Sequence, residues 1–216
     1  MSKKLQYPKV LLVGRTNVGK STLFNRLAKN VKSIVLDQEG VTRDYLQEIV
    51  TWGNKKFDLI DTGGISFKKQ ADSITQRVQD KVLQLFKEAS LILLVCDAKN
   101  GLTEEDQQIA KILHKTKKPL ALILNKSDNI QALEENMPDF YKLGISDIIP
   151  TSAIHGKGMV DLLDKITKTI PNPKEVEAIE EVPALKIVIL GKPNVGKSSL
   201  MNLLLKKERS IVYQEA

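Results

Sequence analysis

The sequence predicts an α/β fold: a mostly parallel sheet with one antiparallel edge strand and helices on both faces. Short apolar runs of strand length alternate with longer segments whose apolar residues recur at helical spacing. A glycine-rich loop joins the first apolar run to the first helical segment. The same strand, loop and helix recur near the end of the sequence, so we expect a second copy of the domain to begin there.

The elements of the first domain follow from these patterns in order. The antiparallel edge comes from a hairpin of residues 45–51 and 56–60, which turns at Gly53 and Asn54. The other expected strands are residues 9–13, 91–96, 120–124 and 148–150. The expected helices are residues 20–29, 70–88, 104–115 and 158–170.

Two prolines mark the end of this domain. Pro171 and Pro173 stop the last helix, and the acidic stretch that follows is typical of an exposed linker. We therefore expect a first domain at residues 1–170, a linker at 171–184, and the truncated start of a second domain at 185–216.

Both glycine-rich loops fit the pattern G-x-x-x-x-G-K-[ST], which binds nucleotide phosphates. Glycines let the backbone wrap the phosphates, several N–H groups face them at the start of a helix, and the lysine adds a point charge. The alternative is a chance glycine-rich turn, but the strand before each loop and the helix after it argue against that. The binding residues of the first loop are Gly14, Arg15, Thr16, Asn17, Val18, Gly19, Lys20, Ser21 and Thr22. Those of the second loop are Gly191, Lys192, Pro193, Asn194, Val195, Gly196, Lys197 and Ser198.

Three positions are expected to supply oxygen ligands to Mg²⁺, which prefers octahedral oxygen coordination. Ser21 ends the first loop, Asp61 opens the motif Asp61-Thr62-Gly63-Gly64 at a strand end, and Thr42 lies in the motif G-V-T-R-D. The Gly64 N–H can contact the γ-phosphate, and hydrolysis would release that contact. An ordinary turn is the alternative for the segment around Thr42.

The base is expected to be guanine, because the motif Asn125-Lys126-Ser127-Asp128 directly follows an apolar strand. Asp128 can accept the N1–H and N2–H₂ groups of guanine, whereas adenine presents an acceptor and a bare carbon at those places. An ATPase is therefore disfavoured. Ser152 and Ala153 follow the next strand, where the small Ala153 can bring its N–H to guanine O6. Each motif alone is a weak signal, and their order along one domain makes it strong.

The order and spacing of these motifs resemble those of the Ras-like P-loop NTPases over residues 9 to about 170. The details GxxNVGKS in both loops, GVTRD, DTGGI, NKxD and TSA resemble the Der (EngA) family of tandem-domain bacterial GTPases. One departure is Thr16, where that family usually has the proline found here at Pro193. The resemblance implies GTP hydrolysis with GTP/GDP and Mg²⁺, a cytoplasmic location, and a role in assembly of the large (50S) ribosomal subunit. Members continue through a complete second domain into a KH-like domain, whereas this sequence stops at Ala216.

Residue Ile65 shapes the expected mechanism. Ras-like proteins have a glutamine there that orients the attacking water, and isoleucine has no polar atom for that task. For relatives with a hydrophobic residue at this place, the resemblance implies that a potassium ion, held with help from Asn17, supplies positive charge. The alternative is that Asn17 only bonds its own loop. We therefore expect Lys20, Thr42, Gly64 and Asn17 to carry catalysis, and the intrinsic rate to be slow.

Composition limits the remaining partners and functions. The net charge of +7 and a pI near 9.3 suit contact with rRNA, although the lysines are scattered and a solvated surface is the alternative. The apolar runs are too short to span a membrane, and we expect no DNA partner. The single cysteine, Cys96, is expected in the core. Two other functions stay open: a GTP-binding module without hydrolysis, and a related GTPase of tRNA modification, which is disfavoured because such chains carry one domain of this kind.

Overall fold

The computed structural model describes residues 3–29, 46–63, 84–177, 195–197, 199–200 and 203 of the 216-residue chain. The chain divides into two compact units. The first comprises residues 3–176, and the second comprises residues 1–2 and 177–216. The described residues of the second glycine-rich loop lie in the second unit.

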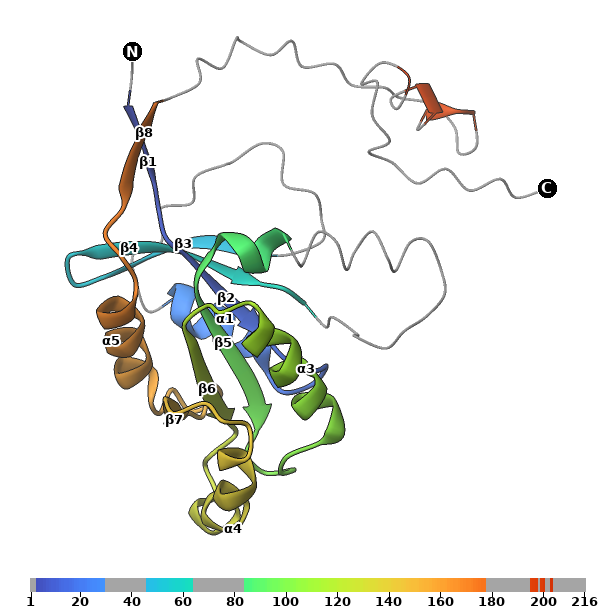
Figure 1. The fold of residues 1–216 in the computed structure, drawn as a ribbon, viewed down its shortest axis with the longest axis vertical. Helices are drawn as coiled ribbons and strands as arrows, with labels where there is room; N and C mark the ends of the chain where they lie inside the picture. Colours follow the sequence, from blue (N-terminus) through green and yellow to red (C-terminus); the bar gives the residue numbers. More distant parts are fainter. Residues whose placement is uncertain are drawn as a thin grey trace. The chain divides into compact units, whose positions relative to one another are not determined.

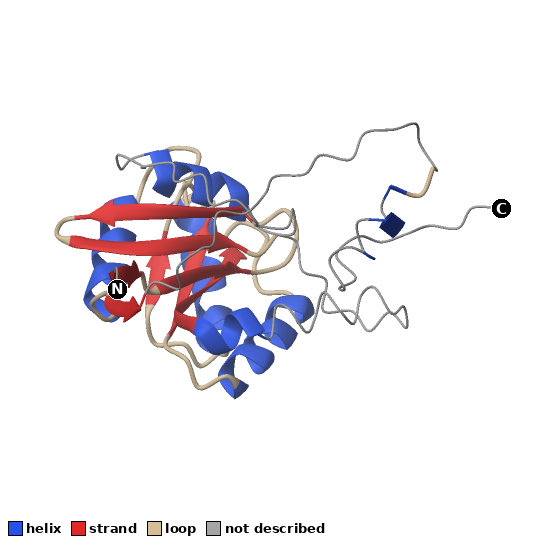
Figure 2. Cartoon of the chain, turned by 90° about the horizontal axis from the view of Figure 1, so that it is seen from above, coloured by secondary structure: helices blue, strands red, loops and turns tan. Residues whose placement is uncertain are grey.

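The main sheet contains six strands (Figure 1, Figure 2). In the order in which they pair, they are β3 (Leu46–Trp52), β4 (Lys55–Asp61), β2 (Lys9–Val13), β5 (Ala89–Asp97), β6 (Leu120–Asn125) and β7 (Ile148–Pro150). β3 and β4 pair antiparallel, and all the other neighbouring strands pair parallel. This arrangement confirms the predicted mostly parallel sheet with one antiparallel edge strand.

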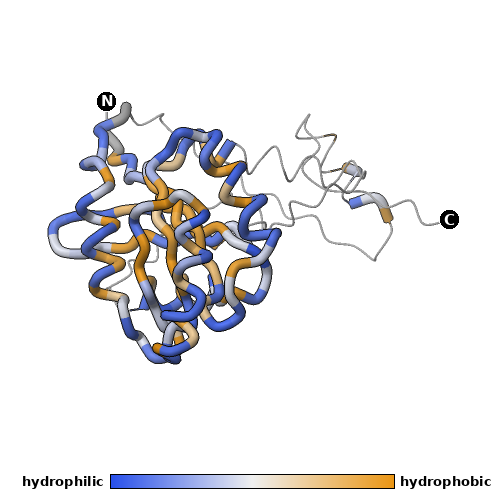
Figure 3. Tube along the Cα trace, turned by 60° about the horizontal axis from the view of Figure 1, so that its bottom comes forward, coloured by the Kyte–Doolittle hydropathy of each residue, from blue (hydrophilic) through white to orange (hydrophobic). Residues whose placement is uncertain are grey.

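Helices cover both faces of this sheet. Those with described bounds are α1 (Lys20–Lys29), α3 (Glu104–Lys115), α4 (Ile130–Tyr141) and α5 (Met159–Thr169). α1 and α5 share one core cluster with strand residues such as Leu93, and α3 and α4 share the other with residues such as Leu94. Adjacent residues of β5 therefore face opposite layers, as the pleat of a strand requires. Figure 3 shows hydrophobic residues gathered along the central segments of the chain, with hydrophilic residues more frequent along its outer segments.

Side-chain caps fix where two of the helices begin. The Thr103 hydroxyl accepts the Asp106 N–H and the Asp106 carboxylate accepts the Thr103 N–H, a capping box that starts α3 at the predicted residue. The Asn129 side chain accepts an N–H from the first turn of α4. The sequence patterns above do not identify α4, although Asn129 ahead of apolar residues at helical spacing is the available signal. Residues 84–88, the end of the predicted helix 70–88, are helical, and residues 70–83 lie outside the described residues.

A second sheet pairs β1 (Lys3–Gln6) with β8 (Lys174–Glu177). Neither strand is predicted from the sequence, and β8 lies inside the stretch expected to be a linker at residues 171–184. The first residues of that stretch are therefore in a strand, and the linker itself stays a prediction. The sequence Lys-Glu-Val-Glu contains a single β-branched residue, so its strand conformation depends on pairing with the distant β1 rather than on local propensity. Within the described residues, no helix has the length and apolar character required to cross a membrane.

Candidate functional site

The predicted site residues collect at one edge of the main sheet. The first glycine-rich loop follows β2, Asp61 ends β4, Asn125 ends β6, and Ser152 and Ala153 follow β7. These strands run parallel, so their carboxyl ends lie at the same edge, where open α/β sheets bind ligands. The fold therefore brings together groups that are far apart in the sequence.

Two glycines of the first loop hold positions that no other residue fits. A Cβ at Gly14 would lie 2.3 Å from the carbonyl oxygen of Val95 in β5. Gly19 has a φ of +93°, and a Cβ there would lie 2.3 Å from Asn125 Nδ2. Val18 is fully buried and anchors the loop, whereas its outward-facing members are exposed. These exposed members are Thr16, Asn17, Ser21 and Thr22.

Lys20, the first residue of α1, is almost completely buried. Its Nζ donates to the carbonyl oxygen of Arg15 at 2.6 Å. Burial lowers the pKa of Lys20, and the attraction of Asp61 opposes that shift. The amine lies in a water-poor loop, bonded to a carbonyl that a phosphate oxygen can replace.

Ser21 and Asp61 form a hydroxyl–carboxylate pair at the start of α1. Ser21 Oγ donates to Asp61 Oδ2 at 2.8 Å, and the Gly63 N–H donates to Asp61 Oδ1 at 3.0 Å. Thr62 is fixed by a bond from its Oγ1 to Leu12 O at 2.7 Å. Hard oxygen ligands of this kind are what Mg²⁺ prefers, so both side chains fit the predicted magnesium site. Among the described residues, no group of three or more His, Cys, Asp or Glu side chains could hold a metal ion.

The Asn125 side chain links the phosphate loop to the loop after β7. Its Nδ2 donates to Val18 O at 2.9 Å, and its Oδ1 accepts the Ala153 N–H at 3.0 Å. Asn125 is 2% exposed, so these bonds are protected from water. The Ala153 N–H, which is expected to reach guanine O6, is bonded to Asn125 in this structure. Its contact with a base remains a prediction.

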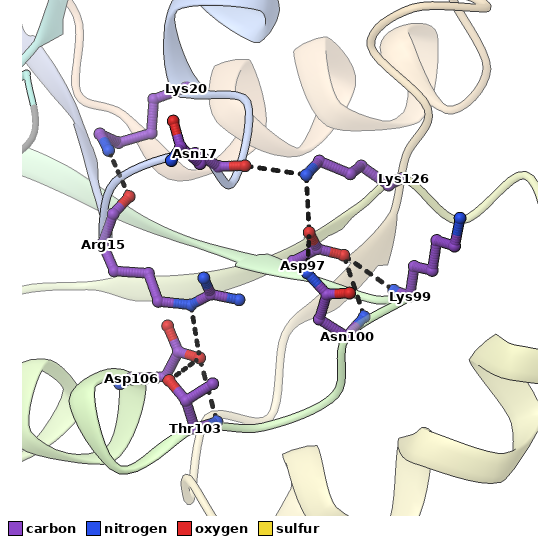
Figure 4. Close-up of polar contacts among 9 residues, drawn as sticks. All are labelled: Arg15, Asn17, Lys20, Asp97, Lys99, Asn100, Thr103, Asp106 and Lys126. Carbon is purple, nitrogen blue, oxygen red and sulfur yellow. Dashed lines mark hydrogen bonds and ion pairs between the residues drawn. The ribbon is translucent and has the colours of Figure 1, made fainter.

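Lys126 connects the phosphate loop to the end of β5 (Figure 4). Its Nζ donates to Asn17 O at 2.8 Å and to Asp97 Oδ2 at 2.6 Å. Asp97 is buried, and its Oδ1 accepts the N–H groups of Lys99 and Asn100. Asp97 is not among the residues expected at the site from the sequence. The available signal is a carboxylate at the end of an otherwise apolar strand.

Asp128 lies at the outer end of this edge and is exposed. Ser152 Oγ donates to Asp128 Oδ1 at 3.3 Å, so the loops after β6 and β7 meet where a base would be held. Ser127 strengthens the same junction, because its Oγ donates to Thr151 O at 2.8 Å. The two predicted base-recognition motifs are therefore adjacent in space.

Cys96 is fully buried in the core, as predicted. Burial raises the pKa of its thiol well above the ordinary range, and the nearby Asp106 carboxylate adds to the rise. A thiol of this kind stays protonated and is a poor nucleophile.

Several predicted site residues lie outside the described residues. They are Thr42, Gly64, Gly191, Lys192, Pro193, Asn194 and Ser198. The second loop is described at Val195, Gly196 and Lys197. Gly196 has a φ of +83°, and its carbonyl accepts the Leu200 N–H at 2.9 Å.

Comparison with known families decides which group of proteins this site belongs to. The sequence matches the family described as 50S ribosome-binding GTPase over residues 9–126 and 186–216. The chain belongs to this family. The first matched range runs from β2 through Lys126, and the second contains the repeated glycine-rich loop.

Most of the chain is also similar to individual proteins that carry the name GTPase Der. The one from Pelotomaculum thermopropionicum is 46% identical over 205 residues, which are 95% of this chain and 46% of that protein. The one from Clostridium perfringens strain 13 is 48% identical over 205 residues, with the same coverage of 95% and 46%. The resemblance to the Der family is confirmed, and the chain spans about half the length of these relatives.

Solved structures confirm the α/β P-loop GTPase fold. A single-residue variant of Aquifex aeolicus Era bound to GDP·AlF₄⁻ is 29% identical with a TM-score of 0.64, over 77% of this chain and 57% of that one. The G domain of the T. maritima FeoB iron transporter is 28% identical with a TM-score of 0.57, over 76% of this chain and 99% of that one.

Proposed function

We propose that this chain binds guanine nucleotides at the carboxyl edge of its main sheet and hydrolyses GTP to GDP and phosphate. The observation that carries the proposal is the position of Asn125, whose amide joins the phosphate loop at Val18 to the loop that holds Ala153. Phosphates and base lie at opposite ends of a nucleotide. The Asn125 side chain bonds to both of the loops that would bind them, and so fixes the distance between these loops. Membership of a GTPase family supports the same conclusion.

The chain's own residues divide into two groups in this proposal. At the phosphate end, Lys20 Nζ exchanges the Arg15 carbonyl for a phosphate oxygen, and the loop N–H groups surround the β-phosphate. At the base end, Asp128 accepts the N1–H and N2–H₂ groups of guanine, and the Ala153 N–H faces O6. Adenine would leave the Asp128 carboxylate without donors, which accounts for the proposed preference for GTP.

Magnesium would be held by Ser21 and Asp61, together with Thr42 from outside the described residues. When bound, the ion neutralises charge on the phosphates. The Ser21 hydroxyl is already within hydrogen-bond distance of the Asp61 carboxylate, so the protein brings both oxygen ligands to one place.

The hydrolysis proposal includes a slow intrinsic rate and stimulation by potassium. Ile65 offers no polar atom to orient water. Asn17 lies on the phosphate loop with a φ of 63°, a left-handed conformation that asparagine tolerates. We place the potassium ligand at Asn17 because of the resemblance to the Der family.

We also propose a cellular role in assembly of the large (50S) ribosomal subunit, with the nucleotide state controlling docking and with direct contact to rRNA. The family description, the Der relatives and the basic net charge of +7 support this role. The proposed contact with rRNA in general, rather than with the large subunit, is also supported by a solved relative that is 28% identical, Era in complex with MgGDPNP and a segment of 16S ribosomal RNA. The proposed location is cytoplasmic. Residues 1–170 form the proposed first GTPase domain and residues 185–216 the start of a second, a division that the family match to residues 186–216 supports.

Single-turnover GTP hydrolysis with Mg²⁺, in potassium or sodium chloride at equal ionic strength, tests the proposal. We expect faster turnover in potassium, and we expect the Asn17→Ala variant to lose that difference. No turnover in either salt, with GTP still bound, would contradict hydrolysis and favour a GTP-binding module.

A further inference from the structure

Arg15 and Asp106 form an ion pair that the chemistry above leaves unused. Arg15 lies in the first glycine-rich loop, and Asp106 lies in the first turn of α3 (Figure 4). Arg15 Nε donates to Asp106 Oδ2 at 3.4 Å, a long distance for charged partners. The Asp106 side chain is fully buried and that of Arg15 is 16% exposed. A pair so far removed from water stabilises its surroundings only when its hydrogen bonds are complete.

One atom on each side of this pair has no hydrogen bond. Among the residues that the structure describes, Arg15 Nη2 and Asp106 Oδ1 are buried and without a partner. Asp106 Oδ2, by contrast, accepts bonds from the Thr103 N–H, from Thr103 Oγ1 and from Arg15 Nε. Arginine and carboxylate groups commonly form two parallel bonds. A small movement of the guanidinium would therefore satisfy both unbonded atoms together.

The backbone of Arg15 connects this pair to the phosphate site. Its carbonyl oxygen accepts Lys20 Nζ at 2.6 Å. A phosphate that draws Lys20 away releases this carbonyl. The residue that carries the guanidinium then gains freedom to shift toward Asp106.

We propose that Asp106 is a positioning residue for phosphate binding, onto whose carboxylate the Arg15 guanidinium closes as a two-bond pair when a nucleotide occupies the loop. This inference rests on the proposed nucleotide binding. The same carboxylate caps α3 through Thr103, so closure couples occupation of the loop to the start of α3. Asp106 acts through Arg15 and needs no contact with the nucleotide.

A double-mutant cycle on the affinity of the full chain for a fluorescent GDP analogue tests this inference. Asp106→Asn keeps an acceptor for Thr103 but removes the second carboxylate oxygen, and Arg15→Ala removes the guanidinium. We expect each variant to weaken binding about tenfold, and the double variant to bind about as well as either single one. Losses that add in the double variant would overturn the proposal.

Thr103→Ala is the matched control, because it removes a capping bond of α3 and leaves the guanidinium and both carboxylate oxygens in place. We expect it to lower the free energy of unfolding while the GDP affinity stays within about twofold of the wild type. An equal loss of affinity in Thr103→Ala and Asp106→Asn would assign Asp106 a purely structural role and overturn the proposal. A wild-type chain that bound no GDP would contradict the proposed function and this inference with it, whereas normal binding by Asp106→Asn would overturn the inference alone.

Discussion

The two glycine-rich loops of this chain have the same backbone turn at the one glycine that is described in both. Gly19 and Gly196 both have positive φ angles, of +93° and +83°. In each copy the N–H of a leucine just after the loop donates to that glycine's carbonyl at 2.9 Å, Leu23 in the first copy and Leu200 in the second. Both loops contain the sequence N-V-G-K-S. The shared local sequence therefore sets this turn of the backbone in both copies.

The two loops differ in how deeply their side chains are buried. Val18 of the first loop and Leu23 of α1 are fully buried, whereas their counterparts Val195 and Leu200 are 62% and 47% exposed. The first loop is held by packing and by Asn125, which comes from a distant part of the sequence. The comparison teaches that local sequence shapes a phosphate loop, while long-range contacts hold it ready for a ligand. We therefore expect nucleotide binding at the first loop alone.

The largest expected difference between the two loops is the effect of alanine at Gly19 and at its counterpart Gly196. A Cβ at Gly19 would collide with Asn125 Nδ2, whereas a Cβ at Gly196 meets no described atom within 4 Å. We expect Gly19→Ala to lower the free energy of unfolding by about 3 kcal/mol and to abolish GDP binding. Gly196→Ala should leave both unchanged in the first domain. Urea unfolding and GDP titration measure these effects, and similar losses from both variants would refute the distinction.

Removal of the Asn125 side chain tests the long-range support directly. Asn125→Ala would leave Val18 O and the Ala153 N–H without partners, at a cost of about 2 kcal/mol in unfolding free energy and with weaker GDP binding. Asn136→Ala is the control, since Asn136 Nδ2 bonds Ala98 O away from the loop. It should lower stability without changing GDP affinity. Unchanged GDP affinity in Asn125→Ala would show that the loop needs no such support.

The base-recognition end should respond in specificity rather than in stability. Asp128→Asn is expected to weaken GDP binding about tenfold and to reduce the preference for GDP over ADP. Asp147→Asn, which alters the half-buried pair with Lys165 away from the site, should leave that preference intact. Competition titrations with the two nucleotides measure it. A preference for guanine that survives in Asp128→Asn would sink the assignment of the base.

The smallest expected effect is a pH dependence from Lys20. Burial lowers its pKa, so just below the ordinary lysine value of 10.5 the unfolded chain binds more protons than the folded chain. Stability should therefore rise with pH in that window, and the full destabilisation is present at lower pH, where Lys20 is charged in both states. Lys20→Met should remove this rise. Lys29→Met, at an exposed residue, should keep it. Urea unfolding from neutral pH to pH 10.5 gives the dependence of the unfolding free energy on pH for each variant. Equal slopes for Lys20→Met and Lys29→Met would contradict this assignment to Lys20.

Local patterns predict the regular elements well. The strand at residues 9–13, the helix at 20–29 and the helix at 104–115 have the predicted bounds, because apolar periodicity and caps act between close neighbours. α4 is absent from the predicted elements even though Asn129 is a recognisable cap. β1 and β8 could not be predicted, since each becomes a strand through pairing with a distant partner.

The motifs predict which residues lie at the site, but they do not predict the hydrogen bonds and ion pairs between these residues. That Asn125, Lys20 and Asp61 lie at one edge follows from their place after parallel strands. The bond from Asn125 to Val18, and the Arg15–Asp106 pair, join residues that no spacing rule connects. Such contacts depend on the packed fold, so the sequence leaves them open.

The central claim is that the first loop alone makes a guanine-nucleotide site in this chain. Calorimetric titration of GDP into the wild type, Lys20→Ala and Lys197→Ala tests it most directly. We predict one site per chain in the wild type and in Lys197→Ala, and no measurable binding in Lys20→Ala. Two sites in the wild type, or binding that survives in Lys20→Ala and disappears in Lys197→Ala, would contradict the claim.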